Sequence, residues 1–156
     1  MRLVHTALPD TAPQLPEVSV RLERQKLAKR LWRAAAEDGT EFGYDGMAPV
    51  RDGDLLAQVQ GVRYVVRQTA EPLLEVALGA PEAAAAVGWA VGNLHFEIEL
   101  QPGRLLAPDD PALRQACERL GLSYRCAVGV FRPHRFAGQA AGHGHRHGDD
   151  FPAHVH

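Results

Sequence analysis

Cysteine is scarce in this sequence, with two residues, Cys117 and Cys126, in a chain of 156. They lie nine positions apart, Cys117 in a helical pattern and Cys126 in a strand pattern. Neither has a partner at the short spacing that a zinc site requires. We therefore expect both to be small buried hydrophobic residues, with a disulfide or a soft-metal site as the alternative.

Excess charge of one sign and long hydrophobic runs are also missing. The 17 Lys and Arg residues and 19 Asp and Glu residues give a net charge of −2, so no basic surplus marks a nucleic-acid or anionic-membrane partner. No run approaches the roughly 20 apolar residues that span a bilayer, and residues 1–18 lack the apolar core of a signal peptide. The sequence predicts a cytoplasmic protein that binds neither nucleic acid nor membrane.

Enzyme motifs are absent as well. The sequence has no Gly-x-Ser-x-Gly, no His-Glu-x-x-His and no phosphate-binding glycine loop. Glu97 and Glu99 alternate along a predicted strand without an evident acid or base partner. We expect a protein that is not an enzyme.

RNA binding is also disfavoured. Tyr124 and Phe131 fall on opposite faces of another predicted strand, which argues against an RNA-stacking surface.

The first half of the chain, residues 1–69, is predicted to be a small all-β domain. Asp38-Gly39 is a strong hairpin dipeptide because both turn positions require positive φ, and Asp52-Gly53 repeats the signal. Short β-rich stretches lie around these turns, at residues 2–6, 18–23, 31–36, 40–44, 55–59 and 61–67.

Residues 70–133 have a different pattern, in which helices alternate with strands. Pro81 opens a helix that should stop at Gly92-Asn93, two residues that tolerate the left-handed conformation. A second helix should start after an Asp109 or Asp110 cap and end at Gly121. Strands are predicted at residues 73–78, 96–100, 104–106 and 124–131. The order β-α-β-β-α-β is the ferredoxin-like pattern, so the predicted fold class is α+β.

Residues 134–156 are rich in Gly, Ala, His and Asp and are predicted to form a flexible tail, because they cannot bury enough apolar surface to offset chain entropy. Imidazole is a ligand for nickel, copper and zinc, and it binds only when deprotonated, so affinity should fall below about pH 6. A flexible segment suits a metal that leaves again. Within the tail, residues 142–156 hold five of the eight histidines: His143, His145, His147, His154 and His156.

Two further histidines are candidate ligands. His95 follows the first predicted helix of the second half, where a single imidazole is more often a surface residue but two could share a metal across a two-fold axis. His134 lies where the folded part should end, and Arg132 and Arg135 beside it would repel a cation. His134 is therefore the weaker of the two candidates.

These features together resemble the urease accessory nickel metallochaperone family. Gly92-Asn93-Leu94-His95 is similar to the Gly-Asn-x-His motif of that family, although its usual arginine is Leu94 here. The histidine-rich tail also fits, whereas Asp109-Asp110-Pro111 replaces histidines that many members carry before the second helix. Three more segments resemble the family: residues 22–30, 50–56 and 110–121.

The resemblance implies a homodimer in which the two copies of His95 face each other and bind one nickel ion, with tail histidines completing the coordination. The N-terminal domain would dock partner proteins, and the nickel would pass to an accessory GTPase in the urease maturation complex. Zn²⁺ and Cu²⁺ remain alternatives to Ni²⁺, because copper should outbind nickel at a plain imidazole site. The competing hypothesis is a passive metal buffer that uses the tail alone and has no need of His95.

Overall fold

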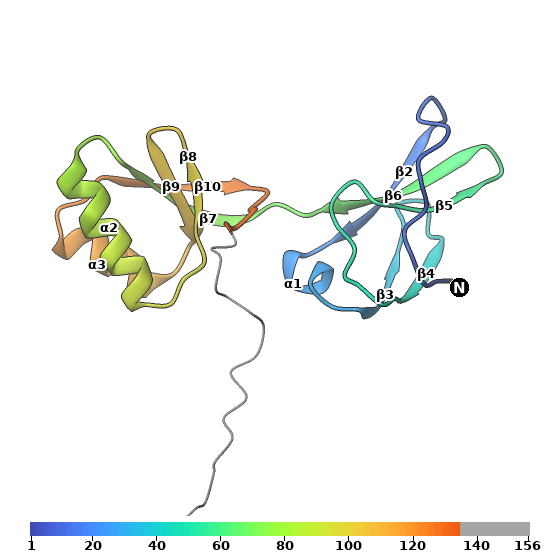
Figure 1. The fold of residues 1–156 in the computed structure, drawn as a ribbon, viewed down its shortest axis with the longest axis horizontal. Coiled ribbons are helices and arrows are strands. Elements are labelled where there is room, and N and C mark those ends of the chain that lie inside the picture. Colours follow the sequence, from blue (N-terminus) through green and yellow to red (C-terminus); the bar gives the residue numbers. More distant parts are fainter. Residues whose placement is uncertain (135–156) are drawn as a thin grey trace, which may run out of the picture.

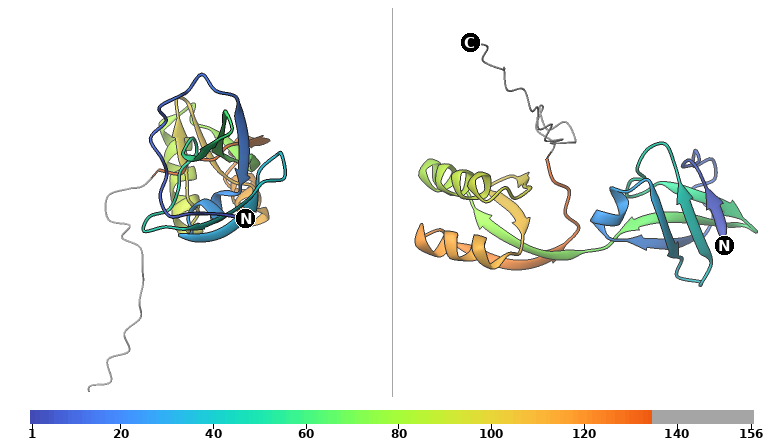
Figure 2. Two further views of the ribbon diagram at one scale, coloured as in Figure 1. Left: turned by 90° about the vertical axis from the view of Figure 1, so that its right-hand side faces the viewer. Right: turned by 90° about the horizontal axis from the view of Figure 1, so that it is seen from below.

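The computed structural model describes residues 1–134 and shows an elongated protein of two halves (Figures 1 and 2). The N-terminal half has two three-stranded sheets, of order β1-β4-β3 and β2-β6-β5, and the C-terminal half has one four-stranded sheet, of order β10-β7-β9-β8. The predicted α+β class is confirmed. The elements are β1 Arg2–Val4, β2 Glu17–Leu22, α1 Arg24–Leu27, β3 Leu31–Ala35, β4 Glu41–Asp45, β5 Leu55–Val59, β6 Val62–Gln68, β7 Glu71–Ala77, α2 Pro81–Asn93, β8 Glu99–Gln101, β9 Arg104–Pro108, α3 Pro111–Arg119 and β10 Tyr124–Gly129.

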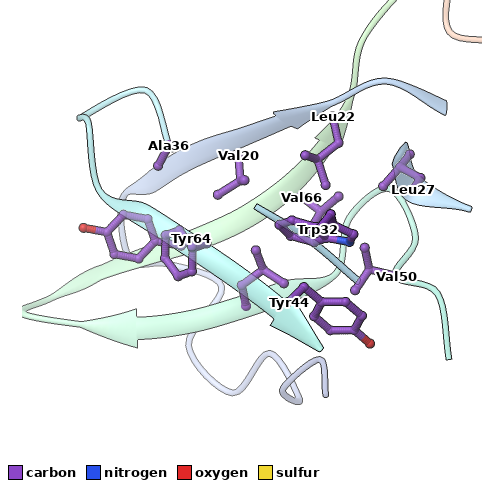
Figure 3. Packing of buried hydrophobic residues seen from close by; sticks show 11 residues of the cluster. Val20, Leu22, Leu27, Trp32, Ala36, Tyr44, Val50, Tyr64 and Val66 are labelled. Atoms are coloured by element: carbon purple, nitrogen blue, oxygen red, sulfur yellow. The ribbon is translucent and has the colours of Figure 1, made fainter. Parts of the chain in front are cut away.

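The sheets of the N-terminal half enclose an apolar core (Figure 3). Strands β3 and β4 form the hairpin that Asp38-Gly39 predicts, with Gly39 at a φ of 85°. Trp32 on β3 stacks on Tyr44 of β4 with ring centres 5.2 Å apart. In contrast to the hairpin, β1 pairs with β4 and β2 with β6 in parallel, so these strands are joined by long connections.

One short helix in this half differs from the all-β prediction. Residues Arg24–Leu27 form the single turn α1, in which the N–H of Leu27 donates to the carbonyl of Glu23 at 3.0 Å. Leu27 is buried in the core, while Gln25 is exposed. Four residues are too few to show a helical period, which is why the pattern does not reveal this turn.

The C-terminal half is an antiparallel sheet with both helices on one face (Figure 2). The apolar side chains of α2 and α3 pack on β7 and β9, and Val87, Leu113 and Cys117 are fully buried there. The order of elements is β7-α2-β8-β9-α3-β10, in the sequence order expected for this part of the chain.

The other face of this sheet is crossed by residues 130–134, which we call the crossing segment. Phe131 is fully buried against Leu73 and Leu106, on β7 and β9. The segment then reaches the outer edge of β8, where the N–H of His134 donates to the carbonyl of Ile98 at 2.7 Å. The chain therefore passes from the β10 edge of the sheet to the β8 edge before residue 135.

Three expectations about this half are wrong in detail. The strand predicted at residues 96–100 is confined to Glu99–Gln101, and the last strand ends at Gly129 because Phe131 turns into the core. Cys117 is buried as expected, but Cys126 is exposed because β10 is an edge strand that the helices cover only partly. Both cysteines are free thiols.

The start of α3 allows a stability prediction. Asp110 is the N-cap, and its carboxylate accepts the N–H of Ala112 at 2.8 Å. Replacing Asp110 by Ala is expected to lower the free energy of unfolding by about 1 kcal/mol, because an N–H of the first turn loses its acceptor. Urea denaturation followed by circular dichroism measures the change. Asp110→Asn is the matched control and should cost much less; equal losses in both variants would contradict the capping role.

Candidate metal-binding site

The C-terminus of α2 places His95 in an unusual backbone conformation. The N–H of His95 donates to the carbonyl of Gly92 at 3.2 Å, and the N–H of Phe96 donates to the carbonyl of Val91 at 3.0 Å. This pair of bonds is a Schellman motif, which requires a left-handed residue just after the helix. His95 is that residue, with a φ of 58°, whereas the sequence predicts Gly92 or Asn93 for this role.

Helix α3 ends in the same motif, and its left-handed position has the residue type that is usual there, glycine. The N–H of Gly121 donates to Glu118, and the N–H of Leu122 donates to Cys117, at 3.2 and 2.9 Å. Its left-handed residue is Gly121, with a φ of 64°. A residue with a Cβ in this conformation costs on the order of 1 kcal/mol, and such strain is found at functional sites. His95 therefore occupies a glycine position at an energetic cost.

The His95 side chain is exposed, and among residues 1–134 no hydrogen bond or ion pair to its imidazole is formed. Both ring nitrogens are thus accessible from outside the chain. One exposed imidazole cannot hold a metal tightly. Within residues 1–134 no group of three or more His, Cys, Asp or Glu side chains is arranged to hold a metal ion. Further ligands would have to come from another copy of the chain or from residues 135–156.

The exposed face of α2 leading to His95 is nearly free of charge. Trp89 is 66% exposed, and its exposed neighbours on this face are Ala85, Gly88 and Gly92. The single charged residue of the helix is Glu82, in its first turn. A large exposed apolar side chain among small residues is typical of a surface that packs against another protein. Trp89 was not among the residues predicted from the sequence to be functional, although its spacing from the small residues Ala85 and Gly92 places all three on one face of the helix.

His134 lies close to the segment that follows His95. Its Nδ1 accepts the N–H of Leu100 at 3.2 Å, so this ring nitrogen already has a donor in the structure. Its backbone N–H is bonded to Ile98, three residues after His95. The structure therefore brings the start of the tail to the same edge of the sheet as the His95 segment. The tail histidines, His143, His145, His147, His154 and His156, lie outside the described residues.

The aspartates before α3 have structural partners. Asp109 receives both Nε and Nη2 of Arg114, the Nε at 2.6 Å, and this ion pair lowers the pKa of the Asp109 carboxyl. Asp110 caps α3. These contacts account for Asp109-Asp110-Pro111 without a metal.

No helix in residues 1–134 has both the length and the apolar character needed to cross a membrane.

Comparisons with known proteins define the class. A family profile described as "UreE urease accessory protein, C-terminal domain" matches residues 71–156. This is a class of proteins that assist urease and are distinct from the enzyme itself.

Whole-chain relatives carry the same description. A "Urease accessory protein UreE" of Ectopseudomonas mendocina is 30% identical over 96% of this chain and 91% of its own length. Proteins of that description from Sinorhizobium fredii and Pseudomonas fluorescens are 32% and 29% identical, over 86% and 100% of this chain and 84% and 96% of their own lengths. The chain belongs to the UreE urease accessory protein family, and the family predicted from the sequence is confirmed.

Proposed function

We propose that the protein is a nickel carrier that acts in the maturation of urease. The observation that carries the proposal is the exposed His95 in a left-handed position where glycine would be less strained. A surface residue held in such a strained conformation is expected to serve a ligand rather than the fold. Membership of the urease accessory family supports nickel as that ligand, with Zn²⁺ and Cu²⁺ as competitors.

The proposed site forms between two chains. A homodimer that packs the uncharged face of α2 around Trp89 would bring the two copies of His95 towards a common axis. Two imidazoles then bind one nickel ion, and tail histidines complete the coordination. In a chain with a single fixed histidine at this position, the dimer is what converts a weak ligand into a tight site.

The remaining parts have roles in delivery. We propose residues 1–69 as a domain that docks partner proteins, residues 70–133 as the ferredoxin-like metal-binding and dimerisation domain, and residues 134–156 as the flexible histidine-rich tail. The nickel passes to an accessory GTPase of the urease maturation complex in the cytoplasm, and the protein itself catalyses no reaction.

Nickel titration by calorimetry, paired with native mass spectrometry, tests this proposal. The wild type, His95→Ala and a chain truncated after Phe136 are compared. We expect His95→Ala to abolish a tight site of about one metal per dimer, because the site loses both central ligands at once. Truncation should remove mainly weaker sites. If His95→Ala binds as the wild type does and truncation removes all binding, the protein is a passive metal buffer that uses the tail alone.

A further inference from the structure

One arginine of the N-terminal half reaches across to the C-terminal half. Arg24, on α1, donates its Nε to Glu71 at 2.9 Å and its Nη1 to the carboxylate of Glu97. Its guanidinium carbon also lies 5.0 Å from the ring centre of Phe131. The side chain is 22% exposed, so these contacts replace most of its hydration. Figures 1 and 2 show α1 at the end of the N-terminal half that faces the other sheet.

The partners of Arg24 belong to the segments that matter for the candidate site. Glu71 is the first residue of β7. Glu97 follows His95 by two residues, between α2 and β8. Phe131 anchors the crossing segment, three residues before His134. One cation therefore holds the connection between the halves, the His95 segment and the start of the tail.

Neighbouring contacts fix the crossing segment between the two halves. The Nε2 of Gln68 donates to the carbonyl of Phe131 at 2.7 Å, and Arg132 forms an ion pair with Asp52 at 2.8 Å. The N–H of Arg132 also donates to Glu99 at 2.6 Å, which ties the crossing segment to β8. The crossing segment is thus held between the sheet of the C-terminal half and side chains of the N-terminal half. Arg24 adds to this arrangement a direct bond to the His95 segment.

Arginine is suited to this role in a way that lysine is not. Its planar guanidinium presents donors in several directions, so it can bind two carboxylates while its face lies on an aromatic ring. A lysine ammonium could satisfy one carboxylate but would lose the second bond or the ring contact. The three contacts therefore depend on the shape of the side chain as well as on its charge.

We infer that Arg24 is a positioning residue for the metal site, holding the His95 segment and the start of the tail in a fixed place against the N-terminal half. The expected effect of Arg24 on nickel binding rests on the proposed function. Its expected effect on amide hydrogen exchange does not depend on a metal. Without Arg24, Glu97 loses its partner across the junction, and the segment from Phe96 to Ile98, which is not part of a strand, becomes looser.

The structural readout is amide hydrogen exchange by NMR in the metal-free protein. Arg24→Gln is expected to speed exchange at His134 and Leu100 by about three- to tenfold, the range set by one or two charge-assisted hydrogen bonds. The control is Arg21→Gln, which removes an exposed ion pair with Glu37 at 2.6 Å inside the N-terminal half and should leave these amides unchanged. Arg24→Lys should restore part of the protection. Equal exchange rates in Arg24→Gln and the wild type would overturn the inference.

A double-mutant cycle with Glu97→Gln tests the route of the effect. If Arg24 acts through Glu97, the two substitutions together should change exchange at Leu100 little more than either alone. Fully additive effects would show that Arg24 does not position the His95 segment through this carboxylate, and the inference would fail.

Nickel calorimetry supplies the second readout. Arg24→Gln should weaken the tight site by about three- to tenfold with unchanged stoichiometry, because the ligand remains but its position is less defined. If His95→Ala removes the tight site but Arg24→Gln binds nickel with wild-type affinity, the positioning role fails and the proposed function stands. If His95→Ala leaves nickel binding intact, the proposed function fails, and the exchange data alone decide whether Arg24 positions the segment.

Discussion

Replacing His95 by glycine is expected to remove the proposed tight nickel site and at the same time to make the folded protein more stable. Glycine adopts a φ of 58° without the steric cost that a Cβ imposes, and Gly121 already occupies the equivalent position of α3. Part of this gain is offset by the greater freedom of glycine in the unfolded chain. We expect the free energy of unfolding to rise by about 0.5–1 kcal/mol.

The loss of nickel affinity in His95→Gly should be at least about a hundredfold, because even outer groups that only orient a ligand are worth tenfold to a hundredfold. Urea denaturation of the metal-free protein and nickel calorimetry measure the two effects separately. His95→Ala is the matched control, since it removes the imidazole but keeps a Cβ; it should lose nickel without gaining stability. A glycine variant less stable than the wild type would contradict the strain at His95.

The second large effect is expected at Phe131. This side chain is fully buried against Leu73 and Leu106, and Arg24 lies over its ring. Phe131→Ala should lower the free energy of unfolding of the C-terminal half by about 3–5 kcal/mol, because it leaves a cavity under the crossing segment. Amide exchange of β7 and β9 in increasing urea measures this loss.

An exposed residue of the preceding strand provides the control for Phe131. Val128 is 75% exposed on β10, so Val128→Ala should change the same free energy by less than about 0.5 kcal/mol. A small effect at Phe131, similar to that at Val128, would mean that the crossing segment contributes little to the fold.

Local signals in the sequence predict most of the elements. Gly39 and Gly53 have a positive φ, but Asp38 and Asp52 do not, and of the two dipeptides Asp38-Gly39 joins paired strands whereas Asp52-Gly53 lies between strands of different sheets. Asp110 caps the helix that Pro111 begins. These features depend on residues close together in the chain, which is why a single sequence reveals them.

The position of His95 depends on packing that the sequence does not display. Leu94 and Phe96, on either side of His95, are both partly buried against the core beneath α2. Ending the helix two or three residues earlier would let Asn93 or Gly92 take the left-handed conformation but would turn these side chains away from the core. The burial of Phe96 therefore decides the end of the helix against the local preference of glycine.

Local sequence patterns do not predict the contacts between distant segments either. Arg24 and Glu97 are far apart in the sequence. Phe131 is predicted to be the last residue of a strand, and only the structure shows that it is buried against β7 and β9. Of the candidate ligands, His95 and His134 are brought to the same region, but only contacts between chains or with residues 135–156 could complete a site.

The two parallel strand pairs of the N-terminal half constrain the order in which the protein folds during synthesis. Arg2 pairs with Phe42, and Glu17 pairs with Arg63, so β1 and β2 leave the ribosome long before their partners. Until β6 is complete, β2 has no neighbour within its own sheet, and its apolar residues stay exposed. The hairpin of β3 and β4 can form at once and is the expected nucleus, whereas the N-terminal half as a whole closes only after residue 68 has been made.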